Sequence, residues 1–139
     1  MPIDYRVDSA RRVLIAEVVG RVTDDDLLAY GRALLDDPRA GEANHEFVDL
    51  RSVDASSIIT SQGVRALAQF WIDAYAKMSG GRLAILAESD VSYGMARMYQ
   101  SYRADGPDEI RIFRDEAEAW DWICDPLSAP RSAPGSCGG

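Results

Sequence analysis

The alternation of apolar and polar positions predicts two strands at the start of the chain. In residues 3–8, three apolar side chains alternate with three charged ones, which is typical of a strand with one buried face. Residues 13–19 are apolar except for Glu17, and only a short turn separates the two segments. We therefore expect an antiparallel hairpin that ends at Gly20.

The longest periodic stretch is a strand, a loop and a helix within residues 46–78. Residues 47–51 read as a buried strand, residues 52–60 are rich in hydroxyl groups, and the helix begins at Ser61. Its apolar positions recur at helical spacing: Val64, Leu67, Ala68, Trp71, Tyr75 and Met78. The start of such a helix exposes free backbone N–H groups, so we expect binding or signalling there.

Another helix is predicted earlier in the chain, before residue 46. Thr23 is its predicted N-cap, and Asp24, Asp25 and Asp26 follow in the first turn, where the helix dipole favours negative charge. Consecutive helical residues point in different directions, so these carboxylates do not predict a metal site. Asp37-Pro38 ends the helix. The predicted buried stripe is Leu27, Gly31, Leu34 and Leu35.

Two more strand–helix units complete the chain. Residues 82–87 show no alternation, which indicates a strand buried on both faces, and Ser89 caps the helix that follows. Residues 110–112 mark a last strand, and residues 115–118 form a capping box that opens a final helix. The predicted inward positions are Val91, Met95, Met98, Tyr99 and Tyr102 in the first helix and Trp120 and Ile123 in the second.

The order β-β-α-β-α-β-α-β-α predicts an α/β fold with a mainly parallel, five-stranded sheet and an antiparallel N-terminal edge strand. Right-handed crossovers between neighbouring strands place the helices on one face. The other face must then be polar, or covered by a terminal segment or a partner subunit. We assign residues 1–124 to a single domain and expect the Pro/Gly/Ser-rich residues 125–139 to be a disordered tail.

Composition narrows the choice of partners and location. The formal net charge of −8 over 139 residues disfavours nucleic acid and anionic lipid surfaces as partners. No apolar run is long enough for membrane insertion, and the start of the chain lacks a signal-peptide pattern. Cys124 and Cys137 do not have zinc-finger spacing, and a chain of this length needs no disulfide. We therefore expect a cytoplasmic protein.

The order of elements, with Val-Asp-Leu-Arg-Ser-Val-Asp ahead of a Ser-x-Gly helix start, resembles the STAS domains of anti-sigma factor antagonists. The resemblance is greatest to stand-alone bacterial SpoIIAA-like proteins of the STAS/SEC14 type, and it covers residues 3–123. It implies a SpoIIAA-like fold and a non-enzymatic regulatory or protein-interaction module. The implied partner is a protein, such as an anti-sigma-type kinase.

In this family a kinase phosphorylates the first serine of Asp-Ser-Ser/Thr-Gly at the helix start. Ser61 matches that serine and Gly63 the glycine, whereas Thr60 and Gln62 replace the aspartate and the second hydroxyl. The resemblance thus implies a partner-binding module with or without the phosphoswitch. Candidate residues of the partner-binding loop are Ser56, Ser57, Thr60, Ser61, Gly63 and Arg65.

Physical chemistry leaves two interpretations of Ser61. A phosphate there would lie on the free N–H groups of the helix, with Arg65 one turn along. Alternatively, Ser61 is only the N-cap, and Thr60 could equally be that cap.

The SEC14-type resemblance implies an alternative, a pocket for a small apolar ligand or lipid. The two central helices are rich in aromatic residues and methionines, but most of these keep the stripe that packs on the sheet. Phe70 and Tyr93 lie off the stripes and are candidates for ligand or subunit contacts, including a homodimer, and Met95 is a further candidate. Arg97 pairs with an acid or reaches an anion near Ser89.

The sequence predicts no enzyme. His45 is the only histidine, and no nucleophile with recognisable flanking residues accompanies it. No P-loop, G-x-G-x-x-G or H-E-x-x-H motif occurs. We expect His45 to be a surface residue, and we assign no catalytic residue, cofactor or metal.

Overall fold

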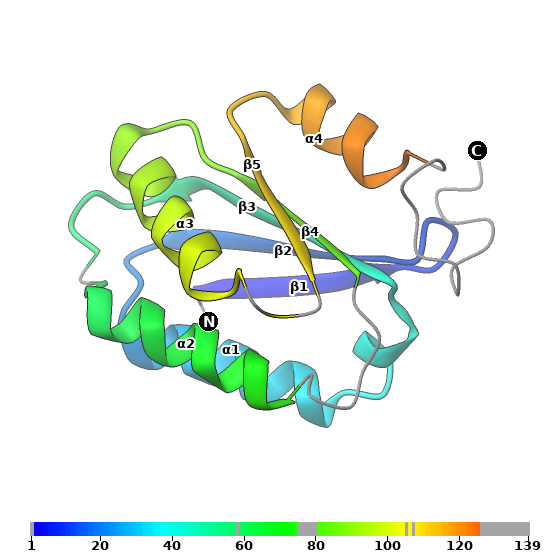
Figure 1. Cartoon of the computed structure of the whole chain (residues 1–139), viewed down its shortest axis with the longest axis horizontal. Helices are drawn as coiled ribbons and strands as arrows, with labels where there is room; N and C mark the ends of the chain where they lie inside the picture. Colours follow the sequence, from blue (N-terminus) through cyan, green and yellow to red (C-terminus); the bar gives the residue numbers. More distant parts are fainter. Residues whose placement is uncertain (1, 58, 75–80, 105, 107, 126–139) are drawn as a thin grey trace.

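The computed structural model describes residues 2–57, 59–74, 81–104, 106 and 108–125. Its centre is a five-stranded sheet in the order β1-β2-β3-β4-β5 (Figure 1). The strands are β1 (Ile3–Asp8), β2 (Val13–Gly20), β3 (His45–Val53), β4 (Arg82–Leu86) and β5 (Glu109–Phe113). β1 pairs with β2 antiparallel, and the other neighbours pair in parallel. The mainly parallel sheet with an antiparallel N-terminal edge strand is confirmed.

Four α-helices follow the predicted order. They are α1 (Asp24–Asp36), α2 (Ser61–Ala74), α3 (Asp90–Tyr102) and α4 (Glu116–Ile123), and a short 3₁₀ helix, η1 (Ala40–Glu42), precedes β3. Thr23, Ser89 and Asp115 are the N-caps of α1, α3 and α4, as predicted. At Thr23 the capping box is complete, because its hydroxyl accepts from Asp26 N and the Asp26 carboxylate accepts from Thr23 N.

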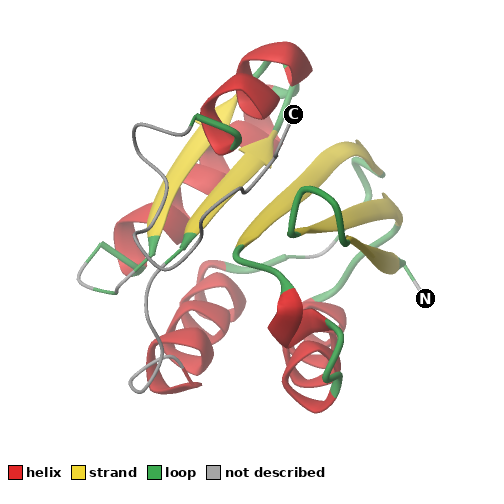
Figure 2. Ribbon diagram, turned by 90° about the vertical axis from the view of Figure 1, so that its right-hand side faces the viewer, coloured by secondary structure: helices red, strands yellow, loops and turns green. Residues whose placement is uncertain are grey.

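The helices do not all lie on one face, and that expectation was wrong for α4. α1, α2 and α3 cover one face of the sheet, whereas α4 packs on the other (Figures 1 and 2). The handedness rule constrains only a helix that joins two parallel strands, and α4 follows the last strand. A terminal segment therefore covers part of the second face. The buried residues there are Val13, Phe47, Ala84, Leu86, Ala119, Trp122 and Ile123.

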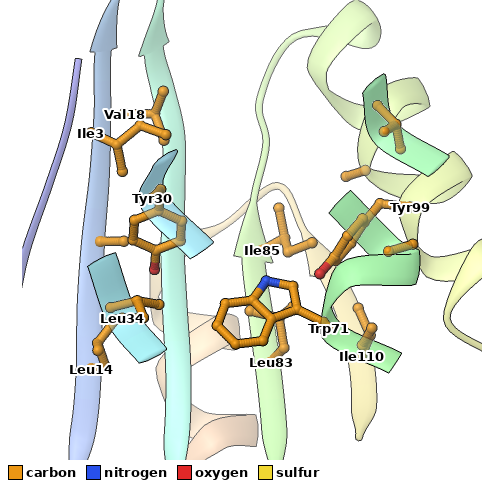
Figure 3. Packing of buried hydrophobic residues seen from close by; sticks show 14 of the residues in the cluster. Ile3, Leu14, Val18, Tyr30, Leu34, Trp71, Leu83, Ile85, Tyr99 and Ile110 are labelled. Atoms are coloured by element: carbon orange, nitrogen blue, oxygen red, sulfur yellow. The ribbon is translucent and has the colours of Figure 1, made fainter. Parts of the chain in front are cut away.

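The main core lies between the sheet and the first three helices. Trp71 of α2 lies between Tyr30 of α1 and Tyr99 of α3, next to the β4 side chains Leu83 and Ile85 (Figure 3). The predicted stripe of α2 is confirmed: Val64, Ala68 and Trp71 are buried and Leu67 is half-buried. Tyr75 and Met78 lie outside the described residues.

Two predicted core positions are wrong. Leu35 is 49% exposed and Val91 is 78% exposed, whereas Tyr30 is buried in α1. Both exposed residues lie in a terminal turn of their helix, where fewer neighbours are available for packing. Periodicity reports which side of a helix a residue faces, but not whether anything lies opposite.

Several expectations concern parts of the chain that the structure does not describe. Residues 126–139 are outside the described residues, so the single domain over 1–124 and the disordered tail stay predictions. Cys124, at the end of α4, is disulfide-bonded, which was not expected, and Cys137 is outside the described residues. Within the described residues, no helix is long and apolar enough to cross a bilayer.

Candidate functional site

The start of α2 forms a small hydrogen-bonded unit in which Thr60, and not Ser61, is the N-cap. Thr60 Oγ1 accepts a hydrogen bond from Gly63 N at 3.0 Å, and its carbonyl accepts one from Val64 N at 3.0 Å. Ser61 is the first helical residue and is exposed, and its hydroxyl has no hydrogen-bond partner among the described residues. The interpretation of Ser61 as the cap is therefore wrong, and the Thr60 alternative is confirmed.

Asp24 of α1 binds the N-cap of α2 through its side chain. Its carboxylate accepts hydrogen bonds from Thr60 N at 2.9 Å and from Thr60 Oγ1 at 2.7 Å. A Cβ atom on Gly63 would lie 2.0 Å from the same carboxylate. Gly63 is thus the residue that lets Asp24 approach, and Asp24 places a negative charge at the positive end of the α2 dipole.

The sequence did not reveal this role of Asp24. The sequence predicted only that its carboxylate lies in the first turn of α1, where the helix dipole favours negative charge. Thr60 is 36 residues away, and no local pattern links the two positions. Only the packing of α1 beside α2 brings them together.

The loop before α2 contains one structural serine and one exposed serine. Ser57 Oγ accepts a hydrogen bond from Val22 N at 3.0 Å, which ties the loop to the connection between β2 and α1. Ser56 is exposed, and its backbone N donates to Asp54 Oδ1 at 2.8 Å. The Ser57 side chain therefore stabilises the fold of the loop, whereas Ser56 is exposed beside Asp54.

Exposed side chains gather around the first turn of α2. We call Ser56, Thr60, Ser61, Gln62 and Arg65 the α2-start surface, since each of them is exposed. The Arg65 guanidinium lies 5.7 Å from the centre of the Tyr102 ring of α3. This cation–π contact holds the guanidinium in place. This surface combines hydroxyls, an amide and one positioned cation on a rigid helix start.

The four residues proposed for ligand or subunit contacts do not converge. Phe70 packs between α1 and α2, where a Cβ on Gly31 would lie 2.8 Å from its ring. Tyr93 carries the Arg114 guanidinium at 4.4 Å from its ring centre, and Arg97 is exposed. Met95 lines the smaller of the two cavities that lie beside the sheet.

Two cavities, each partly open to solvent, adjoin between the sheet and the helices. The smaller, of about 120 Å³, is almost wholly apolar, and its lining includes Leu67, Met95 and Tyr99. The larger, of about 280 Å³, lies toward η1 and the beginning of β4. Glu46, Trp71 and Leu83 line both, so the two spaces meet at these side chains.

Glu46 is the acidic group at this junction. Tyr30 OH donates a hydrogen bond to its Oε2 at 2.5 Å. Burial raises the pKa of the Glu46 carboxyl, although the Tyr30 hydrogen bond and the charge of Arg103 oppose that shift. Arg103 itself is buried and forms an ion pair with Asp108. The junction is therefore polar within an otherwise apolar layer.

His45 is not the surface residue that the sequence predicted. It is 3% exposed, and its Nδ1 accepts a hydrogen bond from Arg82 N at 3.2 Å. Burial, and then the charge of Arg82, lowers the pKa of His45 to about 4, so its imidazole is neutral near pH 7. Consecutive strand residues point to opposite faces, and both His45 and Glu46 line the larger cavity, at the beginning of β3.

Comparison with known proteins establishes the fold. No protein-family model and no curated protein matches the chain. A solved structure from Shewanella loihica PV-4, an uncharacterised DUF3478-family protein with a SpoIIAA-like fold, matches with a TM-score of 0.57 at 18% identity, over 88% of this chain and 93% of that one. The unphosphorylated anti-sigma factor antagonist SpoIIAA matches with a TM-score of 0.54 at 16% identity, over 88% and 98%.

These likenesses define the class of fold. The chain has a SpoIIAA-like, STAS-type α/β fold, as the resemblance in its element order implied. At such low identity the likeness concerns the fold alone.

Proposed function

We propose that the chain is a non-enzymatic regulatory module that binds a protein partner through the α2-start surface. The arrangement of Asp24, Thr60 and Gly63 carries this proposal, because it fixes an exposed helix start with a defined charge. The likeness of the fold to that of an anti-sigma factor antagonist supports it. The proposed partner is a protein of the anti-sigma kinase class, and the proposed location is the cytoplasm.

We further propose that partner binding does not need phosphorylation of Ser61. A phosphate carries about −1.5 to −2 charges at neutral pH and is stabilised at an unoccupied helix start. Here the Asp24 carboxylate already occupies that position, so a phosphate on Ser61 would meet a like charge at close range. Asp24 supplies a permanent negative charge where the switch would supply a reversible one.

Site-specific photo-crosslinking in the producing cell tests the surface. A photoreactive residue at Gln62 is expected to give one discrete protein adduct, because Gln62 is exposed at the centre of the surface. The matched control places the same residue at Glu42, an exposed position of η1. The proposal fails if both positions give the same adducts or if neither gives any.

Three variants then test the surface and separate constitutive binding from a phosphoswitch. Arg65→Glu reverses the exposed cation of the surface and should abolish the Gln62 adduct, whereas Ser61→Ala should leave it intact. Ser61→Asp should weaken it, because the new charge lies beside Asp24. A phosphate on Ser61 in the intact mass of protein from its natural source, with loss of the adduct in Ser61→Ala, would contradict the proposal of a permanent charge.

A second candidate function rests on the cavities, namely the binding of a small apolar ligand. An apolar cavity of about 150 Å³ holds a benzene-sized molecule, and the smaller cavity of about 120 Å³ approaches that size. A ligand that extends from it into the larger cavity would pass the Glu46 carboxyl, so a short apolar body with a hydrogen-bonding head fits this path. The space is too small for a two-chain lipid.

Native mass spectrometry and thermal unfolding test this candidate. A ligand-binding protein should carry a co-purified molecule, or its melting temperature should rise with benzene or 1-hexanol as probes. Ala96→Leu, which fills the smaller cavity from α3, should remove the effect, whereas Gly94→Ala on the open side of α3 should not. No bound molecule and no rise with either probe would reject a ligand-binding role.

A further inference from the structure

The outer edge of β1 is the open edge of the sheet. β1 and β5 are the two end strands, and neither has a second neighbour among the described strands (Figure 2). The β5 edge is partly covered by α3, because Gln100 Nε2 donates a hydrogen bond to the Ile110 carbonyl at 2.6 Å. No hydrogen bond of this kind involves the outer edge of β1 within the described part of the chain. An uncovered edge is a template for another strand.

The pairing with β2 determines which groups of β1 face outward. Val19 N donates to the Pro2 carbonyl at 2.7 Å, and this bond belongs to the same register in which Ile3 lies opposite Val18. In an antiparallel ladder, hydrogen-bonded pairs alternate with non-hydrogen-bonded ones. The even-numbered residues of β1 therefore bond to β2, and the odd-numbered ones present their N–H and C=O groups to the outside.

The side chains on the helix-free side of β1 carry unneutralised charge. Asp4 and Arg6 are exposed, and neither makes an ion pair among the described residues. Asp4 also lies directly opposite Glu17 of β2, and like charges in that position are destabilising. A cation from a neighbouring strand would relieve this pair.

We propose that a second copy of this chain occupies the edge, with two β1 strands antiparallel across a two-fold axis at Tyr5. An outward-facing residue can bond only to another outward-facing residue, which restricts the axis to a few positions. An axis at Asp4 puts Asp4 against its own copy, and an axis at Arg6 does the same for Arg6. The axis at Tyr5 puts Asp4 of each copy against Arg6 of the other.

This register satisfies backbone and charge together. Ile3 lies opposite Val7 of the second copy, and the outward-facing backbone groups bond in pairs. Asp4 and Arg6 form non-hydrogen-bonded pairs, in which the side chains of the two strands are closest. The resulting contact is self-complementary and closed, so it produces dimers without extending into fibres. The continuous sheet leaves the α2-start surface, on another part of the molecule, available for a different partner.

Sedimentation velocity of the full chain tests the dimer. The measurement uses roughly 0.15 M salt, since a charge of −8 on each copy opposes association at low ionic strength. The wild-type chain should dimerise reversibly in the concentration range up to roughly 0.5 mM. Arg6→Asp and Asp4→Arg should each weaken dimerisation about tenfold, because both turn two attractive cross-strand pairs into repulsive ones.

The double variant Asp4→Arg/Arg6→Asp is the decisive control. It restores both pairs with the charges exchanged, so it should recover dimerisation to within about twofold of the wild type. Arg97→Asp makes the same charge change on exposed α3 and should have no effect. A wild-type chain that stays monomeric, a double variant that does not recover, or dissociation by Arg97→Asp would each overturn the proposal.

Discussion

At the scale of single residues, β3 begins with two ionisable side chains in opposite situations. His45 is buried on one side of the strand and accepts a hydrogen bond from a backbone N–H, while Glu46 is bonded by Tyr30 on the other. Burial shifts both groups toward the neutral form, which lowers the pKa of His45 and raises that of Glu46. Each makes the stability of the fold depend on pH, with opposite sign.

The pH dependence due to His45 can be predicted with its sign. The pKa of this imidazole is 6.5 when unfolded and about 4 in the fold. Between these values the unfolded chain binds more protons, so acidification through this window lowers the free energy of unfolding. The largest contribution is about 3 kcal/mol. Urea unfolding at intervals across the window should show this loss in the wild type.

His45→Gln keeps an acceptor for the backbone N–H but cannot titrate, so its stability should change less steeply with pH. Glu46→Gln is the matched control. It removes a carboxyl whose pKa is raised in the fold. That carboxyl stabilises the fold at low pH, and this stabilisation is lost as the pH rises through its pKa in the folded protein. If the free energy of unfolding changes equally steeply with pH in the wild type and in His45→Gln, the imidazole is already charged in the fold.

At the scale of elements, α1 and α2 are linked through their first turns. Asp24 bonds to Thr60, and the absence of a side chain at Gly63 makes room for its carboxylate. Neither helix start can change without affecting the other. A rigid α2 start therefore depends on α1 as well as on its own cap.

Gly63→Ala should lower stability by about 1 kcal/mol, because its Cβ displaces Asp24 from Thr60. In an Asp24→Ala background the same substitution should be neutral or stabilising, because alanine favours the helix. Chemical unfolding of the four chains gives the coupling energy. Gly94→Ala is the control: its Cβ meets nothing within 4 Å, and it should stabilise by about 0.5–1 kcal/mol. Additive effects of Gly63→Ala and Asp24→Ala would argue against the contact.

The cap of α2 gives a second prediction at this scale. Thr60→Ala removes the hydroxyl that accepts from Gly63 N and should cost about 0.5–2 kcal/mol. Ser61→Ala removes an exposed hydroxyl without a partner in the described structure and should change stability by less than about 0.5 kcal/mol. The two variants are compared by chemical unfolding. If Ser61→Ala lowers the free energy of unfolding more than Thr60→Ala does, Ser61 is the N-cap and not Thr60.

At the scale of the whole molecule, the sheet is covered unequally. Three helices bury one face, and α4 packs on the part of the other face that belongs to β2, β3, β4 and β5. Trp120 stacks on Phe47 with ring centres 4.5 Å apart, which anchors the helix. The charged remainder of this face, toward β1, is where the proposed second copy adds its strand.

The position of α4 predicts where truncation of a side chain is costly. Ile123→Ala should lower stability by about 2–5 kcal/mol, because its side chain is 1% exposed against the second face of the sheet. Val91→Ala, at 78% exposed, should change it by less than about 0.5 kcal/mol. Thermal and urea unfolding of both variants checks the difference. A small effect of Ile123→Ala would mean that α4 is only loosely docked.

Local patterns in the sequence predict the order of the elements and most of their ends. Alternation, helical spacing and caps such as Thr23, Ser89 and Asp115 are local, because they act between residues a few positions apart. Right-handed crossovers then fixed the strand order and the face of the first three helices. The SpoIIAA-like fold follows from these local rules.

Contacts between side chains that are far apart in the sequence depend on how the elements pack. The face of α4, the burial of His45, the contact of Asp24 with Thr60 and the junction at Glu46 all depend on packing between elements distant in the sequence. Periodicity states which side of an element a residue faces, but only the neighbouring element determines what it touches there. The candidate site is made of such contacts, and for that reason local patterns located its loop but not its chemistry.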